Sequence, residues 1–336
     1  MKHLRLIFIA ILLISSGILY AQEDQKQNLF KFSGYVQAGY RVGNIDEIKS
    51  NSFYLQRAIL TLDGGFSTKN ESKVDYCLMM NATTPNILEL WVRYMPAREF
   101  GIQVGQFRIP LTIENSDYAP LRIELIDYSQ PIIRLNQVGG DVSGINSAGR
   151  EMGLKLFGGF IHKEHHSIIN YDFAVLNGNG INRRDNDQSK DIIGRLRISP
   201  IRYLSIAGYY QDGTFKVGEA ASQKLNRYGG GVCYDDNTFV VRSEYVGGKT
   251  GDILSEGAYL LAGYHFTEKF MAVARADYFK FEKELEDYDM FYTLGLTYQP
   301  VKKFKIQANY TLKNSIFSNN DKIYTHLFNI MATAIF

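Results

Sequence analysis

The 336-residue sequence is poor in cysteine and tryptophan and, after its first 21 residues, in long apolar runs. The 2 cysteines, Cys77 and Cys233, stand far apart and supply no disulfide framework. A single disulfide between them is the alternative in an oxidising compartment, but we expect two unpaired small apolar residues. Past Ala21 no uninterrupted apolar run reaches about a dozen residues, which excludes helices long enough to span a membrane. The single Trp contrasts with 23 Tyr and 21 Phe, and tyrosine in such numbers suits a membrane–water interface.

Net charge is also lacking. The chain has 37 basic and 35 acidic side chains, and without Lys2 and Arg5 of the amino-terminal segment the numbers become 37 − 2 = 35 and 35. This balance gives no reason to expect a nucleic-acid partner. Any preference for one sign of ion must come from where individual charges lie.

Signatures of catalysis are missing as well. There is no Gly-x-Ser-x-Gly elbow, and the few histidines have no evident serine or acid partner, so a hydrolase is disfavoured. Three histidines that could suggest a metal site sit in a polar connection, where a solvated turn is the simpler interpretation. They are His162, His165 and His166. We therefore predict neither an enzyme nor a cofactor.

One acidic stretch has the spacing of a calcium loop. Its possible ligands are Asp185, Asp187, Ser189 and Asp191, but Lys190 stands where the sharp turn of such a loop needs glycine. No metal site is predicted there.

The amino terminus has the layout of an export signal. Lys2 and Arg5 precede an apolar run over residues 6–20, and Ala21 precedes polar residues. This pattern predicts a cleaved signal peptide over residues 1–21 and a mature chain over residues 22–336. A membrane anchor is the alternative, although the run is short for a span of about 20 residues.

The stretch over residues 301–336 shows what the mature chain is built from. Phe304 and Ile306 alternate with Lys305 and Gln307, which is the period of a strand with one apolar and one polar face. The same alternation continues to the terminal Phe336. A last strand that ends in phenylalanine resembles the assembly signal of bacterial outer-membrane β-barrels.

The whole mature chain divides into segments of this kind. We predict 16 strands of about ten residues, an even number, each close to the length that a tilted strand needs to cross a membrane. They lie near residues 31–41, 52–63, 71–81, 87–96, 99–109, 149–160, 167–178, 190–199, 201–213, 224–235, 238–248, 254–266, 269–281, 288–299, 301–313 and 324–336.

The connections between these segments alternate in length. Those after even-numbered segments are mostly tight turns, such as residues 235–237 and 267–269. Those after odd-numbered segments are mostly longer and more polar, such as residues 177–189, 214–225 and 247–255. Bacterial barrels have short periplasmic turns and longer extracellular loops, whereas a β-sandwich has no reason to alternate this way.

Several segments carry charge on one face only. An arginine that faced lipid at the membrane midplane would cost about 2–4 kcal/mol, so the charged faces must point inward. A charged interior must be wet, and about 16 strands enclose a lumen wide enough for a channel. Gln56 falls on the lipid side of its segment, and Arg150 shares a face with Met152 and Leu154. The predicted pore-lining or anion-binding residues are Arg57, Arg93, Arg108, Arg195, Arg197, Arg242 and Arg275.

One connection, residues 110–148, is out of scale. It is too apolar for a disordered segment, and we interpret it as a loop that folds into the lumen and narrows it. An ordered extracellular flap is the alternative. Its charged residues are predicted to set the selectivity of the constriction. They include Glu114, Asp117, Arg122, Glu124, Asp127 and Arg134.

Through nearly the whole mature chain, the sequence resembles the phosphate-selective porin O/P family. The resemblance rests on an Arg-bearing strand at 53–63, on the Gly-Gln-Phe-Arg-Ile-Pro-Leu block at 105–111 and on Arg-Glu-Met-Gly at 150–153. It implies a trimeric, 16-stranded and often anion-selective channel. It also implies that Arg57 and Arg108, together with Arg195, line the pore.

The loop departs from what a phosphate binder needs. Its charged residues are 2 arginines, no lysine and 5 acidic residues, which are Glu114, Asp117, Glu124, Asp127 and Asp141. A phosphate site should converge several Lys or Arg donors at one height. Two classes of channel, an anion channel and a general or cation-tolerant porin, therefore remain open.

Together these patterns predict an all-β transmembrane barrel of the bacterial outer membrane. We expect a homotrimer in contact with outer-membrane lipids, which passes small hydrophilic solutes or inorganic anions such as phosphate by diffusion. A non-selective porin is the alternative within the class. A barrel that serves as a surface scaffold or adhesin is the alternative outside it.

Overall fold

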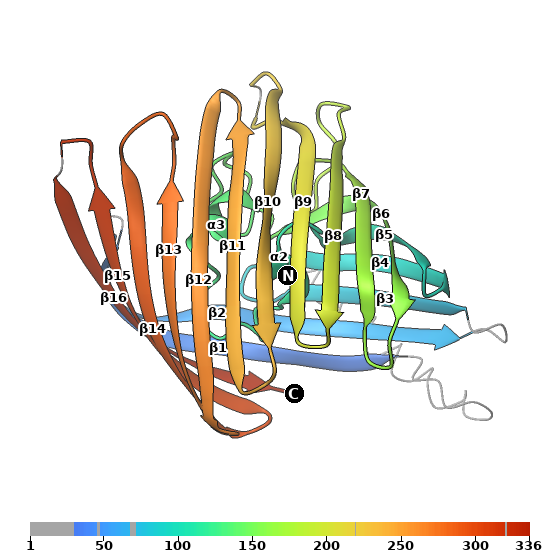
Figure 1. Ribbon diagram of the computed structural model, residues 1–336, viewed down its shortest axis with the longest axis horizontal. Coiled ribbons are helices and arrows are strands. Elements are labelled where there is room, and N and C mark those ends of the chain that lie inside the picture. The colour runs from blue at the N-terminus through green and yellow to red at the C-terminus, as the bar shows by residue number, and fades with distance from the viewer. Residues whose placement is uncertain (1–29, 46–47, 68–71, 219, 320) are drawn as a thin grey trace, which may run out of the picture.

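The computed structural model describes residues 30–45, 48–67, 72–218, 220–319 and 321–336. The predicted signal segment 1–21 lies outside the described residues. Sixteen antiparallel strands form one closed barrel in which each strand pairs with its sequence neighbours and β1 pairs with β16 (Figure 1). The strands are β1 (Lys31–Ile45), β2 (Ile48–Ser67), β3 (Lys73–Asn81), β4 (Asn86–Ala97), β5 (Phe100–Arg108), β6 (Arg150–His162), β7 (Ser167–Leu176), β8 (Asp191–Ile201), β9 (Leu204–Phe215), β10 (Gln223–Asp235), β11 (Phe239–Thr250), β12 (Ile253–Thr267), β13 (Phe270–Lys280), β14 (Tyr288–Val301), β15 (Phe304–Ile316) and β16 (Lys322–Ile335).

All sixteen predicted strands are confirmed, with differences at their ends. The largest is in β2, which has 20 residues because it continues in both directions beyond the predicted segment 52–63. The predicted long connection 247–255 is wrong, because Thr250 pairs with Ile253 and leaves a two-residue turn. The glycines and polar residues of this stretch suggested a loop, but its backbone groups pair between β11 and β12 as far as the turn.

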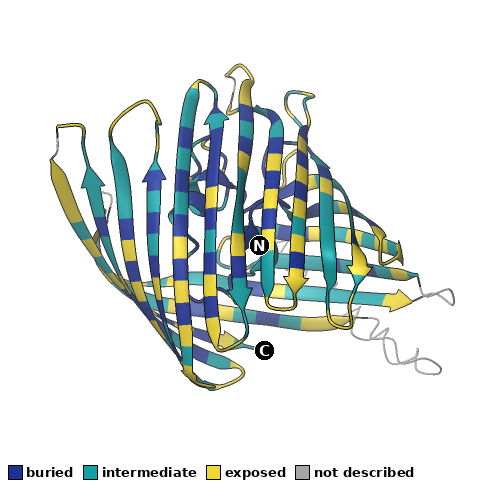
Figure 2. Ribbon diagram, in the orientation of Figure 1, coloured by how far each residue is buried: buried dark blue, intermediate teal, exposed yellow. Residues whose placement is uncertain are grey.

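Along each strand, buried and exposed side chains alternate, as the banding in Figure 2 shows. In β8, Asp191, Ile193 and Arg195 are buried, whereas Ile192 and Leu196 are about half exposed. The exposed face is apolar and the buried face carries the charge, the reverse of a water-soluble protein. The predicted inward orientation of the charged faces is confirmed. Within the described ranges no helix is long and apolar enough to cross a membrane.

A β-bulge explains why Gln56 seemed to face lipid. The register between β1 and β2 shifts between Gln37 and Ala38, which leaves Gln56 without a partner in the ladder. The extra residue reverses the alternation locally, so Gln56 points inward and its Nε2 donates to Asp127 Oδ1 at 3.1 Å. The Arg150 side chain also points inward. Arg150 is the first residue of β6 and follows a turn in which Ala148 and Gly149 have positive φ, so the alternation of the strand does not apply to it.

The loop between β5 and β6 lies inside the barrel (Figure 1). It contains two short helices that the sequence did not predict, α2 (Ile113–Asp117) and α3 (Gln130–Leu135). Its apolar residues Leu111 and Ile132 are fully buried in one cluster with Val246 and Leu261 of the barrel wall. The interpretation as a loop within the lumen is confirmed, and the alternative of an extracellular flap is wrong.

Both cysteines are buried and free. Cys77 lies on β3 and Cys233 on β10, on opposite arcs of the strand order. The expectation that they are unpaired is confirmed.

Candidate functional site: the lumen of the barrel

Arg242 of β11 is the centre of the contact between loop and wall. Its Nη2 lies 2.6 Å from Glu124 Oε2 and 3.3 Å from Glu114 Oε1, and the side chain is 0% exposed. The guanidinium carbon is 4.0 Å from the ring centroid of Tyr118, a cation–π contact. The Tyr118 hydroxyl lies 2.9 Å from Cys233 Sγ, and burial raises the pKa of this phenol. Both loop carboxylates thus share one wall cation.

Glu244, two residues further along β11, binds the beginning of α2. Its carboxylate accepts hydrogen bonds from the backbone N–H groups of Ile113 at 2.5 Å and Glu114 at 2.8 Å. The hydroxyls of Tyr209 and Tyr259 donate to the same carboxylate at 3.3 Å and 2.8 Å. Four donors on one buried carboxylate hold the helix start in place, since breaking any of these bonds leaves a buried polar group unsatisfied.

Other wall cations donate to backbone carbonyls of the loop. Arg275 of β13 donates to the carbonyls of Asp127 at 2.9 Å and Tyr128 at 3.2 Å. Lys305 of β15 donates to the carbonyl of Leu121 at 2.9 Å. These bonds fix the position of the loop backbone whatever its side chains are.

The end of the loop is held from β10. Arg227 Nε donates to the carbonyl of Leu135 at 3.0 Å, and its Nη2 lies 3.6 Å from Asp141 Oδ1. A glycine in the wall allows close approach: a Cβ at Gly295 would lie 2.4 Å from Leu125 Cδ2. The loop is therefore packed against the wall from β9 to β15.

The opposite wall, from β2 to β8, borders an open cavity of about 700 Å³. Six cations and four carboxylates line it. The cations are Arg93, Arg98, Arg108, Lys155, Arg195 and Arg197, and the carboxylates are Asp63, Glu89, Asp117 and Asp172. Its lining reaches Arg98 in the short turn after β4, at the end that faces the periplasm in bacterial barrels.

Three wall arginines lie on the side of the lumen near Tyr128 of the loop. Burial raises the pKa of Tyr128; the charges of Arg108, Arg150 and Arg57 oppose that rise, and the charge of Glu114 adds to it. Arg108 and Arg150 share Glu89, at 3.4 and 3.3 Å. Arg57 donates to the neutral Gln37 Oε1 at 3.0 Å. We call Arg57, Arg108 and Arg150 the arginine cluster. Its three positive charges outnumber the one negative charge that it contacts, that of Glu89.

The structure divides the predicted pore-lining residues into three groups. Those that border the open cavity are Arg93, Arg108, Arg195 and Arg197. Arg57 joins the arginine cluster, whereas Arg242 and Arg275 lie beneath the loop and are bonded to it. The sequence did not single out Arg150 or Lys155. Its alternation grouped Arg150 with Met152 and Leu154, although the block at 150–153 gave a signal that could have identified it.

The charged loop residues also separate by position. Glu114, Glu124 and Asp127 are bonded to the wall, and Asp117 pairs with Arg195 and Arg197 at the edge of the open cavity. The guanidinium carbon of Arg134 lies 5.1 Å from the ring centroid of Phe279.

Arg122 borders a second cavity, of about 650 Å³, on the side of β11 to β16. This second cavity has two cations, Arg122 and Lys305, and three carboxylates, Glu124, Asp235 and Glu268. It lacks the excess of cations found on the other side.

One histidine has partners that the sequence did not indicate. His162 Nδ1 lies 2.8 Å from Ser167 Oγ, and its Nε2 lies 2.9 Å from Glu99 Oε1. The expectation of histidines without such partners is wrong here, because Glu99 comes from the neighbouring turn, 63 residues earlier in the chain. The contact links the turn after β4 to the turn after β6.

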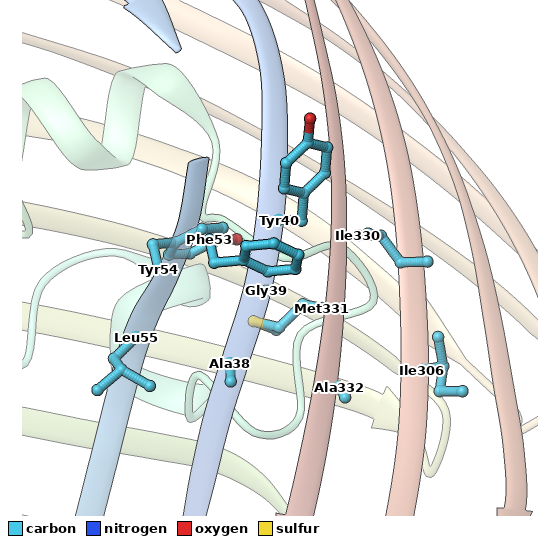
Figure 3. A pocket seen from close by; sticks show the side chains of 10 residues that line it. All are labelled: Ala38, Gly39, Tyr40, Phe53, Tyr54, Leu55, Ile306, Ile330, Met331 and Ala332. Atoms are coloured by element: carbon cyan, nitrogen blue, oxygen red, sulfur yellow. The ribbon is translucent and has the colours of Figure 1, made fainter. Parts of the chain in front are cut away.

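The groove drawn in Figure 3 is not part of the lumen. It lies among β1, β2, β15 and β16, and its lining is apolar apart from the tyrosine hydroxyls. Phe53 and Leu55 on its rim are 86% and 74% exposed, so the groove opens on the outer, lipid-facing surface. It offers no path for a hydrophilic solute.

Fold and lumen together define the class: an outer-membrane β-barrel with the architecture of a porin. No protein-family model and no curated protein matches the sequence. Among solved structures, the anion-selective porin from Comamonas acidovorans aligns with a TM-score of 0.71 and 12% identity, over 91% of this chain and 99% of that one. The outer-membrane channel DcaP of Acinetobacter baumannii aligns with a TM-score of 0.65 and 12% identity, over 91% and 97%.

The trimer form of OmpT, an outer-membrane protein of Vibrio cholerae, aligns with a TM-score of 0.68 and 10% identity, over 91% and 99%. At such identities the likeness shows the fold. It does not carry the solute or the selectivity of those proteins over to this chain.

Proposed function

We propose that the protein is a porin that passes small hydrophilic solutes by diffusion and prefers anions. The observation that carries the proposal is the open cavity beside β2 to β8, which six cations and four carboxylates line, and where Arg108 and Arg150 share the single carboxylate Glu89. Charged side chains that line a narrow water-filled passage set its ion preference, because an ion that crosses it replaces part of its hydration shell with contacts to those side chains. A surplus of guanidinium groups favours anions.

The acidic loop does not oppose this preference. Glu114 and Glu124 are paired with the buried Arg242, and Asp141 lies against Arg227. A carboxylate neutralised by a buried cation contributes little to the field in the open lumen. The acids that argued for a cation-tolerant porin are mostly groups that attach the loop.

The test is the reversal potential of the refolded protein in a planar bilayer under a KCl gradient. We expect an anion-signed potential that moves toward cations when Arg57 and Arg108 are both replaced by Gln. The matched control is Lys249→Gln, a surface residue near Asp252. A cation-signed potential in the unmodified protein contradicts the preference, and absence of current favours the scaffold or adhesin alternative.

Inorganic phosphate is the finer part of the proposal. Arg108 and Arg150 share the one carboxylate Glu89, and neighbouring guanidinium groups can offer phosphate oxygens bidentate hydrogen bonds. Phosphate added at constant ionic strength should reduce the chloride current, and the double variant Arg57→Gln/Arg108→Gln should lose that reduction. Equal effects of phosphate and sulfate would leave a general anion channel.

We also propose a homotrimer. It is supported by the likeness to the trimer form of OmpT and by the apolar outer groove among β15, β16, β1 and β2, where another barrel could pack in place of lipid. Light scattering in detergent, corrected for bound detergent, should give three times the mass of one chain. A single-chain mass contradicts it without affecting the channel proposal.

A second candidate function, ester hydrolysis, is favoured by one observation, the bonded sequence Ser167–His162–Glu99. We rank it below the channel because Glu99 is 49% exposed, and an acid in water orients and polarises a histidine weakly. Hydrolysis of a p-nitrophenyl ester that disappears in Ser167→Ala, with conductance retained, would establish it.

A further inference from the structure

The open cavity contains an unusual set of neighbours, cations beside aromatic rings. Trp91, the only tryptophan of the chain, lies on β4 and lines the cavity. The guanidinium carbon of Arg93 lies 5.1 Å from the Trp91 ring centroid and 5.8 Å from that of Phe157. Lys155 Nζ lies 5.4 Å from the Phe107 centroid and 5.3 Å from the Phe157 centroid. Two cations and two partly exposed rings, Trp91 and Phe157, thus form one continuous surface over the buried Phe107, and we call it the aromatic–cation surface.

The cations of this surface are not equally neutralised. Arg93 pairs with Asp75 at 2.7 Å, a short and strong contact. The contact of Lys155 with Asp172 is long, at 3.9 Å. Asp172 also contacts Arg195, at 3.4 Å, so its charge is shared between two cations. Lys155 is therefore the cation best placed to bind an anion that enters the cavity.

The rings add something that a small inorganic ion cannot use. Chloride and phosphate interact with cations and hydrogen-bond donors, and an aromatic surface offers them neither. An organic anion with a flat apolar body gains from both parts, because its ring can pack on Trp91 and Phe157 while its charge meets Lys155. The cavity of about 700 Å³ has room for such a molecule.

We propose that the aromatic–cation surface is a binding site for organic carboxylates with an aromatic body, and that these are solutes of the channel. The inference rests on the proposed channel function and narrows its substrate class. Lys155 and Arg93 bind the carboxylate, and Trp91 and Phe157 pack against the ring. The neighbouring carboxylates, Asp172 and Asp75, keep the net charge low enough for the solute to leave again, as conduction requires.

The test compares three small molecules in the planar bilayer at constant ionic strength. Benzoate has the ring and the charge, acetate has the charge alone, and benzyl alcohol has the ring alone. We expect benzoate to reduce the chloride current at concentrations about tenfold lower than acetate, in line with the gain from aromatic packing, and benzyl alcohol to have no effect.

Two substitutions separate the two parts of the site. Trp91→Leu should weaken the benzoate block about threefold to tenfold and leave the acetate block unchanged. Lys155→Gln should weaken the blocks by both carboxylates, about twofold to fivefold. The matched control is Lys313→Gln on the opposite wall, where Nζ lies 5.5 Å from the Phe291 centroid and 3.2 Å from Asp289 but outside this cavity. It should leave the ratio of the two blocks as it was.

The outcomes distinguish this inference from the channel proposal. No current in KCl alone would overturn both. A chloride current that benzoate and acetate reduce equally would overturn the inference and leave the anion channel standing. A benzoate block that Trp91→Leu does not change would place the binding elsewhere and overturn it too. Trp91→Phe, which keeps an aromatic ring, should retain most of the benzoate block.

Discussion

Arginines on the two walls of the barrel have different roles: on one wall they hold the loop, and on the other they face the open cavity. On β10 to β15, Arg242, Arg227 and Arg275 are almost fully buried and bonded to the loop. On β4 and β8, Arg93 and Arg197 have side chains that are 31% and 33% exposed to the open cavity. For these five arginines burial separates the two roles, because a buried ion pair is shielded from solvent whereas an exposed one is available to a passing ion. Arg195 of β8 borders the cavity, but its side chain is 5% exposed and pairs with Asp117 of the loop, so it is closer to the buried group.

This contrast also corrects how charges in a loop should be counted. Five acids against two bases suggested a cation-tolerant constriction. Most of these acids have cationic or amide partners on the wall, so the count describes the attachment of the loop. The selectivity depends on the charges that remain in contact with water.

The largest effect is expected at the attached side. Arg242→Ala removes the partner of Glu114 and Glu124 and leaves two buried carboxylates uncompensated, which should lower the free energy of unfolding by about 3–5 kcal/mol. Urea unfolding in lipid vesicles measures the change. The freed loop should also make the single-channel current larger or noisier.

Arg98→Ala is the control for that experiment, since it removes an arginine from the turn after β4, away from the loop contact. It should change the unfolding free energy by less than about 0.5 kcal/mol. Equal losses in the two variants would contradict the contrast between the walls.

A smaller loss is expected for Glu244→Gln. Oε2 of Glu244 accepts from the Ile113 N–H and Tyr209, and Oε1 accepts from the Glu114 N–H and Tyr259. The NH₂ group of glutamine replaces one of these oxygens and cannot accept from its N–H or its hydroxyl. At least one buried donor loses its partner, at a cost of about 1–3 kcal/mol. Urea unfolding again measures it. Double variants that also carry Tyr259→Phe should recover part of the loss, and no recovery would mean that the cost arises elsewhere.

Tyr118→Phe should have a still smaller effect. It removes the hydroxyl beside Cys233 Sγ and keeps the ring against Arg242. The expected loss is about 0.5–1.5 kcal/mol, the worth of one hydrogen bond, measured as a shift of the urea midpoint. Tyr118→Leu should cost more because it also removes the cation–π contact, and the reverse order would mean that the ring does not stabilise Arg242.

Much of the fold could be predicted because each strand carries its own signal. The alternation of Phe304 and Ile306 with Lys305 and Gln307 needs no information from the rest of the chain. The ends of the strands were harder, since they depend on pairing: β2 continues to Ile48 because it pairs with β1 there. The bulge at Gln56 has the same origin, and no local pattern reveals it.

The site was predicted only in part, for a reason of geometry. Alternation could show that Arg197 and Arg242 both point inward, but which of them meets the loop depends on how residues 110–148 fold. The contact between Arg242 and Glu114 joins residues 128 positions apart. Arg150 was missed because it begins β6 directly after a turn, which alters the alternation there. Lys155 lies in the regular ladder of β6, where its contacts with Phe107 and Phe157 depend on strand pairing.

Apart from the Arg98 control, the smallest change in stability is expected for Arg197→Gln on the open wall, which is also the sharpest test of the contrast. Its ion pair with Asp117 is 3.4 Å long and its side chain is 33% exposed, so the loss should stay below about 1 kcal/mol. The reversal potential should nevertheless move toward cations, since one positive charge leaves the cavity and Asp117 is less neutralised. At the attached side the order is opposite, with a large loss of stability for Arg242→Ala. A variant of Arg197 that destabilises the barrel without moving the reversal potential would remove the distinction between an arginine that attaches the loop and one that acts on the solute.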